Sequence, residues 1–276
     1  MTGTERIAVY SGGLLDDMHA KTTHGIIRFG SRRVCAVVDE RWAGHRADDV
    51  APFCAMAIPV VGTVDEAHEM GATRLVIGVA PSGGKLTAQW RAVLLRAIEL
   101  GMDIEAGLHT ELGADPELGP AAAAAGIEIT DLRHSPTDLD VPRGPAQRAP
   151  GFVVHTVGSD CAIGKMTVVC ELDRAARARG IASQLVATGQ TGIAITGWGI
   201  AVDHVISDYI AGAAERLVDE GARRGGELIL VEGQGSLLHP AYSGVTLGLL
   251  HGSAPDALIL AHEAGSPHID GYPEVG

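Results

Sequence analysis

The stretch VVHTVGSDCAIGKMTVV, residues 153–169, constrains this chain more than any other. It combines an apolar strand-like run, a loop bounded by Gly158 and Gly164, and Lys165 at the expected start of a helix. Amide N–H groups in the first turn of a helix lack partners in the helix, and the helix dipole adds positive potential there. Glycines let the backbone approach an anion closely, and the lysine adds a full charge. The stretch therefore predicts a phosphate-binding loop made of Gly158, Ser159, Asp160, Cys161, Ala162, Ile163, Gly164, Lys165, Met166 and Thr167.

The residue after the lysine departs from the usual pattern. A Ser or Thr hydroxyl normally follows and binds Mg²⁺, but here Met166 follows and Thr167 comes one residue later. A thioether is a poor ligand for Mg²⁺, and the side chain of Thr167 points about 100° further round the helix. Either the helix begins in a shifted register or the metal site is weak. We therefore expect a loop that holds phosphates without driving their hydrolysis.

Composition limits the class of protein. The 276 residues suffice for two α/β domains, and 46% hydrophobic content with 4% aromatics predicts a core of Ala, Val, Ile and Leu. A net charge of −13 without a basic stripe argues against nucleic-acid and anionic-membrane partners. No stretch reaches the ~20 apolar residues of a membrane span. The four cysteines form no CxxC pair, so we expect reduced thiols and a cytoplasmic protein. Gly- and Ala-rich segments hint at a homo-oligomer.

Strand-like and helix-like segments alternate along the chain. Over residues 5–132, short β-like runs such as RIAVYSG and RVCAVVDE alternate with amphipathic stretches, and FVVHTVG begins a second alternation. Such a pattern predicts parallel sheets with right-handed crossovers. The segment 135–151 contains four prolines and few apolar residues, as linkers do. We therefore predict an α/β fold with one domain over 1–140, a linker over 141–151 and a second domain over 152–276.

Periodicity predicts individual helices in the second domain. We expect one helix over 164–179 and a longer one over 203–222, whose apolar residues recur on one face. Asp203 stands at the expected start of the longer helix. It is a candidate N-cap and, alternatively, a candidate substrate contact.

Polar turns follow the apolar strands of the second domain. After the phosphate loop come Thr188–Gly192 and Glu232–Ser236, each at the end of a strand. Ligands of open α/β sheets bind at the C-terminal strand ends, so we expect these turns to converge on one crevice. The candidate substrate contacts in them are Gln190, Thr191, Gln234 and Ser236.

Glu232 ends an apolar run, where a carboxylate is costly unless it has a partner. It is a candidate general base, a candidate Mg²⁺ ligand together with Thr167, or a cap of the turn. His239 and His251 follow in a Gly-rich stretch and are candidate bases or structural histidines. In the first domain, Arg133 is a candidate for binding a substrate carboxylate, or a surface charge.

The motifs also resemble known proteins. GSDCAIGK resembles the loop of dethiobiotin synthetase, and LVEGQGS resembles its strand-end acidic motif. More closely, the chain resembles a family with an N-terminal Rossmann-like domain and a C-terminal P-loop domain, whose best-understood members are D-glutamate (D-amino-acid) N-acetyltransferases. The matching segments are AKTTHGIIR, LVIGVAPSGG, GMDIEAGLH, DLRHSP, VGSDCAIGKMT, ATGQTGI and VEGQGSLLHPAYSGVTLGLLHGSAPDALILAHE.

The resemblance implies a Rossmann-like parallel-sheet domain followed by a P-loop NTPase-like α/β domain. It also implies acetyl transfer from acetyl-CoA to the amine of a small acidic amino acid, glutamate-like and of D configuration. Glu232 and His251 are then the candidate bases, with oxyanion donors among the amides of the Gly-rich turns. Members usually continue past the ALILAHE strand, so we expect a shortened C-terminus here.

Two other functions stay open at this point. The first is a ligase or kinase that uses ATP with Mg²⁺, in the manner of dethiobiotin synthetase, and Thr167 with Glu232 on the metal would favour it. The second is a nucleotide sensor without catalysis.

Overall fold

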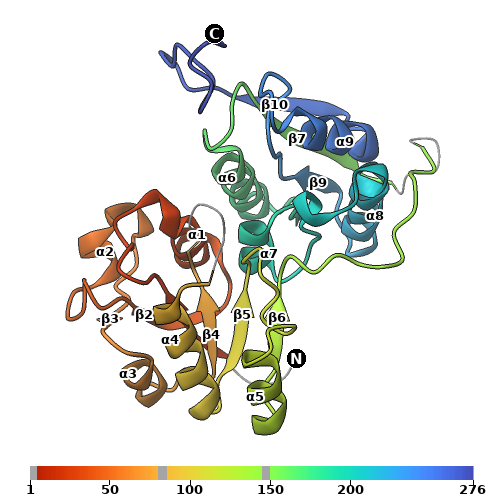
Figure 1. The fold of residues 1–276 in the computed structure, drawn as a ribbon. Coiled ribbons are helices and arrows are strands. Elements are labelled where there is room, and N and C mark those ends of the chain that lie inside the picture. The colour runs from red at the N-terminus through yellow and green to blue at the C-terminus, as the bar shows by residue number, and fades with distance from the viewer. Residues whose placement is uncertain (1–4, 80–85, 145–149, 276) are drawn as a thin grey trace. The chain divides into compact units, whose positions relative to one another are not determined.

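The computed structural model of the chain describes residues 5–79, 86–144 and 150–275. The chain divides into two compact units, Met1–His134 and Ser135–Gly276 (Figure 1). The division falls shortly before residue 140, where the sequence placed the end of the first domain. The predicted linker, residues 141–151, falls within the second unit, and its residues 145–149 lie outside the described residues.

A parallel sheet forms the centre of the first unit, with the strand order β3-β2-β1-β4-β5-β6. This order is typical of a Rossmann fold and confirms the predicted fold class. The strands are β1 (Arg6–Tyr10), β2 (Arg33–Val38), β3 (Val60–Val61), β4 (Arg74–Ile77), β5 (Asp103–Ala106) and β6 (Ile129–Asp131). The helices are α1 (Lys21–Phe29), α2 (Ala47–Val50), α3 (Val64–Glu69), α4 (Ala88–Glu99) and α5 (Leu118–Ala125), with 3₁₀ helices η1 (Met18–Ala20) and η2 (Pro52–Cys54).

Helices cover both faces of this sheet. Ala36 and Val38 of β2 pack in the same cluster as Leu94 of α4. Val37, between them, points to the other face and packs with Ile27 of α1. Successive strand residues point to opposite faces, so a sheet buried on both sides needs the nearly continuous apolar runs seen in the sequence.

The second unit contains another parallel sheet, in the order β10-β7-β9-β8. The strands are β7 (Phe152–Gly158), β8 (Ser183–Val186), β9 (Leu228–Val231) and β10 (Ala257–Ala261). The helices are α6 (Lys165–Ala178), α7 (Gln190–Thr196), α8 (Ile210–Arg223) and α9 (Ser243–Ser253), with 3₁₀ helices η4 (Val202–His204) and η5 (Ser207–Tyr209). Among the described helices, none has the length and apolar character needed to cross a bilayer.

Helices α8 and α9 lie side by side on one face of this sheet, and α6 lies on the other (Figure 1). The two helices approach closely at Gly252, where a Cβ would stand 1.9 Å from the carbonyl oxygen of Ala211. Leu217 of α8 packs against Val153 and Val231 of the two central strands. Because β7, β8 and β9 are parallel, the segments that follow them meet at one edge of the sheet.

The long helix predicted over 203–222 is wrong in its first turns. Helix α8 begins only at Ile210, and Asp203 lies in η4 rather than at a helix N-cap. Val205 interrupts the helical path with extended backbone, φ −86° and ψ 139°, yet its side chain is buried. This irregular segment buries apolar residues at the spacing typical of a helix, and that spacing led to the wrong prediction.

The segment Thr188–Gly192 is also more ordered than the predicted turn. Helix α7 begins at Gln190 and runs to Thr196, and Thr191 to Ile195 are all buried in it. A helix buried on all sides has no amphipathic period, so the pattern alone did not indicate it.

Candidate functional site

The phosphate-loop candidate lies between β7 and α6. Helix α6 begins at Lys165, as the sequence predicted, and Gly164 precedes it with a left-handed φ of 98°. The N–H of Val168 donates to the Gly164 carbonyl at 2.9 Å. The N–H groups of the first turn, Lys165 to Thr167, therefore point out of the helix toward the loop. Since the register is not shifted, Met166 occupies the position where a Mg²⁺-binding hydroxyl usually stands.

Lys165 is almost fully buried, at 6% exposure, and folds back over the loop. Its Nζ donates to the carbonyl oxygen of Asp160 at 2.6 Å. A Cβ at Gly158 would stand 2.8 Å from this Nζ, so the glycine provides the space that the ammonium group occupies. Burial lowers the pKa of Lys165. The chain thus positions a desolvated positive charge where a phosphate ligand would bind.

Asp160 holds the loop together through both carboxylate oxygens. Its Oδ1 accepts from the Cys161 N–H at 2.6 Å, and its Oδ2 accepts from the Asp270 N–H at 2.7 Å. Asp160 is 7% exposed, and a buried charge requires such hydrogen bonds. We infer a structural role for this loop carboxylate.

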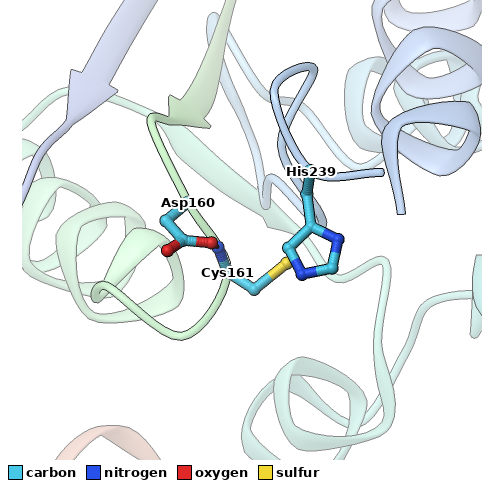
Figure 2. A group of neighbouring side chains, drawn as sticks. All are labelled: Asp160, Cys161 and His239. Carbon is cyan, nitrogen blue, oxygen red and sulfur yellow. Dashed lines mark hydrogen bonds between the residues drawn. The ribbon is translucent and has the colours of Figure 1, made fainter. Parts of the chain in front are cut away.

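Asp160, Cys161 and His239 form a group in which one possible ligand atom of each residue lies within 4.8 Å of the other two (Figure 2). The ring of His239 stacks on Tyr242 at 4.6 Å between centroids and meets Tyr272 edge-on at 5.2 Å. Its Nδ1 accepts from the Ala241 N–H at 3.2 Å. Burial raises the pKa of the Cys161 thiol, which opposes a role for this cysteine as a nucleophile.

Glu232 stands at the end of β9 and is 5% exposed. Its Oε2 accepts from the N–H groups of Thr188 and Gly189, at 2.9 and 3.1 Å. Its carbonyl oxygen accepts from the Thr188 hydroxyl at 2.8 Å. A Cβ at Gly192 would stand 2.4 Å from Oε2, so only glycine fits there. These contacts favour the interpretation of Glu232 as the residue that fixes the start of α7.

The structure brings the turns after β7, β8 and β9 together, as expected. Gln234 donates from Nε2 to the Thr188 hydroxyl at 3.2 Å, which joins the second and third turns. The Gly233 N–H donates to the Thr156 hydroxyl on β7 at 2.9 Å, which joins the third turn to the first strand. Ser236 is fully buried and accepts at Oγ from the Leu238 N–H. Gln190 and Thr191 begin helix α7 in the same set of turns.

Three other candidates belong to other segments. His251 is exposed in the last turn of α9. A helix that connects two parallel strands ends at the edge of the sheet where the strands begin, whereas the phosphate loop lies at the edge where they end. Asp203 is exposed in η4. Arg133 is buried in the first unit, where its Nε donates to the Gly107 carbonyl at 2.8 Å. His251, offered as an alternative to Glu232 for the base, thus lies at the opposite edge of this sheet from the loop.

Nothing in the sequence marked Thr156, and the pattern placed Thr188 in a polar turn without predicting its contacts. Their hydroxyls connect the turns, since Thr156 accepts from Gly233 and Thr188 donates to Glu232. A threonine inside a strand-like run is expected on β propensity alone and gives no signal of such a role. Asp270 was also missed, because it bonds through its backbone N–H, which no sequence pattern marks.

Comparison with known proteins places these features in a family. The Rossmann-like N-terminal domain of DUF1611, a domain of unknown function, matches residues 40–135, and the DUF1611 P-loop domain matches residues 140–276. A DUF1611 family protein from Anabaena variabilis, known from a crystal structure at 2.30 Å resolution, superposes with a TM-score of 0.90. It is 38% identical, and the match covers 98% of this chain and 78% of that one.

Two curated relatives carry a functional name. A D-glutamate N-acetyltransferase of Tritonibacter scottomollicae is 45% identical over 212 residues, or 77% of this chain and 62% of the relative. A D-glutamate N-acetyltransferase of Pseudoalteromonas sp. is 42% identical over 209 residues, or 76% of this chain and 62% of the relative. The chain thus spans less than two thirds of the length of these relatives.

Proposed function

Because the chain belongs to the DUF1611 family, we propose that it works as an N-acetyltransferase with acetyl-CoA as donor and D-glutamate, or a similar acidic amino acid, as acceptor. The names of the two curated relatives support the reaction class and the acceptor. Cys35, Cys54, Cys161 and Cys170 are reduced thiols, which fits the conditions of a cytoplasm. The predicted homo-oligomer stays a prediction.

The observation that carries the proposal is the loop with its buried Lys165. Coenzyme A contains a diphosphate and a further phosphate, and a helix N-terminus with a desolvated lysine is suited to bind such groups. Acetyl transfer leaves every phosphate intact. The loop therefore needs no Mg²⁺-binding hydroxyl, and Met166 in that position is tolerated.

The proposal changes the role given to Glu232. The thioester of CoA lies at the far end of the pantetheine arm, away from the diphosphate that the loop would hold. Glu232 is buried against the turn after β8, where it accepts two backbone N–H bonds. We therefore assign it the positioning of α7 instead of proton transfer. The amine still requires a base, and the thioester carbonyl requires a donor for its developing oxyanion.

The ATP-dependent alternative is less well supported. It would use Thr167 and Glu232 as Mg²⁺ ligands, but helix α6 starts in the unshifted register and the Oε2 of Glu232 is taken up by two amides. Among the described residues, the group whose atoms lie close enough together to hold a metal ion is Asp160, Cys161 and His239, and not Thr167 and Glu232.

The test is calorimetric titration with acetyl-CoA and with ATP, each with and without Mg²⁺. We expect acetyl-CoA to bind without metal, and Lys165→Ala to weaken binding roughly tenfold or more through loss of a charge-assisted contact. Lys21→Ala, an exposed lysine of α1, is the matched control and leaves affinity unchanged. Acetylation is then followed on D- and L-glutamate. Binding of ATP only, in a Mg²⁺-dependent way, would refute the proposal.

A further inference from the structure

His239 lies beside the phosphate-loop candidate, yet the proposed function gives it no task. The residue is only 3% exposed, and its ring is held by a stack on Tyr242 and an edge contact with Tyr272. A buried imidazole held on two sides has one orientation. The direction in which its second ring nitrogen, Nε2, points is therefore fixed.

The hydrogen bonds assign the proton on this ring. The Ala241 N–H donates to Nδ1 at 3.2 Å, so Nδ1 presents a lone pair. In a neutral imidazole the proton then sits on Nε2, which becomes a donor. Figure 2 shows the ring edge carrying this nitrogen turned toward the sulfur of Cys161. Among the described residues, no group accepts a hydrogen bond from Nε2. A mostly buried ring thus turns its Nε2 donor toward Cys161 in the loop.

A metal ion is the first ligand that Asp160, Cys161 and His239 suggest, since zinc takes His, Cys and Asp. Metal binding requires a lone pair on the histidine nitrogen and a deprotonated thiol. Here Nε2 carries the proton, and both Asp160 oxygens already accept backbone bonds. The group is arranged as a donor beside an anion site.

We propose that His239 binds the phosphate ligand of this loop, by donating from Nε2 to a phosphate oxygen on the side opposite the first turn of α6. The inference rests on the proposed function, because it assumes that the loop holds a phosphate of CoA. It adds a binding residue that lies 74 positions after Lys165 in the sequence, on the turn that follows β9. The charge of Lys165 and the Nε2–H donor of His239 then act on one phosphate group.

Calorimetry with CoA and with inorganic pyrophosphate tests the inference. His239→Phe keeps the aromatic stack but removes the donor, and we expect it to weaken both ligands roughly tenfold or more. His239→Gln, which restores an N–H group, recovers part of the affinity. His68→Phe, at an exposed position of α3, is the matched control and leaves affinity unchanged. Thermal melts verify that each variant is folded.

The outcomes distinguish a failure of the role proposed for His239 from a failure of the proposed function. If Lys165→Ala weakens CoA and His239→Phe does not, the role of His239 is refuted while the loop stands. If neither variant changes affinity, the loop is not the phosphate site, and the proposed function loses its main support. A Co²⁺-thiolate absorption band that disappears in Cys161→Ser would show a metal site and overturn the inference.

A readout on the native chain keeps the inference testable if the variants fail to fold. In long-range ¹H–¹⁵N spectra of the wild-type protein, we expect His239 as the Nε2–H tautomer, with its proton shifting when CoA is added. The Nδ1–H tautomer, or an unshifted proton at saturating CoA, would contradict the proposal.

Discussion

His155 should make the second unit sensitive to mild acid. This histidine of β7 is fully buried, and burial lowers its pKa from 6.5 to about 4. Its Nδ1 faces the hydroxyl of Ser253 at 3.0 Å, and that hydroxyl donates to the Leu249 carbonyl at 2.7 Å. The Ser253 oxygen therefore accepts from Nδ1–H. The other nitrogen, Nε2, is buried without a hydrogen-bond partner.

The size of the effect follows from linkage between protonation and folding. The unfolded chain takes up a proton near pH 6.5, while the folded chain resists until about pH 4. Stability from the neutral ring is thus fully present above pH 6.5 and is lost as the pH falls toward 4. The full loss is about 3 kcal/mol, because one pKa unit corresponds to about 1.4 kcal/mol. Between pH 7.5 and 5.0 the expected loss is about 2 kcal/mol.

The assay compares wild type with His155→Leu, which has similar volume and cannot titrate. Urea unfolding is followed by the fluorescence of Trp198, which packs against the core of the second unit. From pH 7.5 to 5.0, we expect the stability difference to shift by about 2 kcal/mol in favour of the variant. His204→Leu, at an exposed histidine of η4, should show no such shift. A difference between wild type and His155→Leu that stays constant with pH would refute the reasoning.

Two further changes test the packing of the turns. Glu232→Gln replaces a charged acceptor of two N–H bonds with a neutral one, and we expect urea unfolding to show a loss of about 1–2 kcal/mol; an unchanged midpoint would contradict its role in holding α7. Gly233→Ala would place a Cβ 1.6 Å from the Thr156 carbonyl oxygen and should cost about 3 kcal/mol or more, seen as lost soluble yield or a lowered midpoint. At Gly244 in α9 an added Cβ would meet open space, so Gly244→Ala should raise the free energy of unfolding by up to about 1 kcal/mol. If Gly233→Ala and Gly244→Ala had equal effects, the steric explanation would be disproved.

The sequence was sufficient for the parts of the fold that depend on local pattern. The apolar run before Gly158 and the Gly164-Lys165 pair predicted β7 and the start of α6 correctly, because strand, glycine and helix signals are local. It failed at Val205, which is buried from extended backbone, and at α7, which is buried all round. In both segments the conformation is decided by tertiary packing rather than by local sequence preference.

The candidate site was predictable in its location but not in its contacts. That the turns after β7, β8 and β9 meet follows from parallel strands alone. Whether Glu232 is a base or a cap depends on which N–H groups face it, and these belong to residues more than 40 positions away. His239 looked like one loop histidine among several. What distinguishes it is the arrangement of Ala241, Tyr242 and Tyr272 around its ring. The spacing of residues in the sequence does not reveal this arrangement.

The bond between Lys165 and the Asp160 carbonyl has a consequence for how binding responds to alkali. The ammonium group of Lys165 is already removed from water before a ligand binds. An incoming anion therefore replaces the Asp160 carbonyl with a stronger acceptor, and the charge it meets is preorganised. The same burial brings deprotonation of this amine to lower pH than for a lysine in water. Affinity for anions should then decline early on an alkaline titration, and the decline should vanish in Lys165→Arg, whose guanidinium keeps its proton throughout.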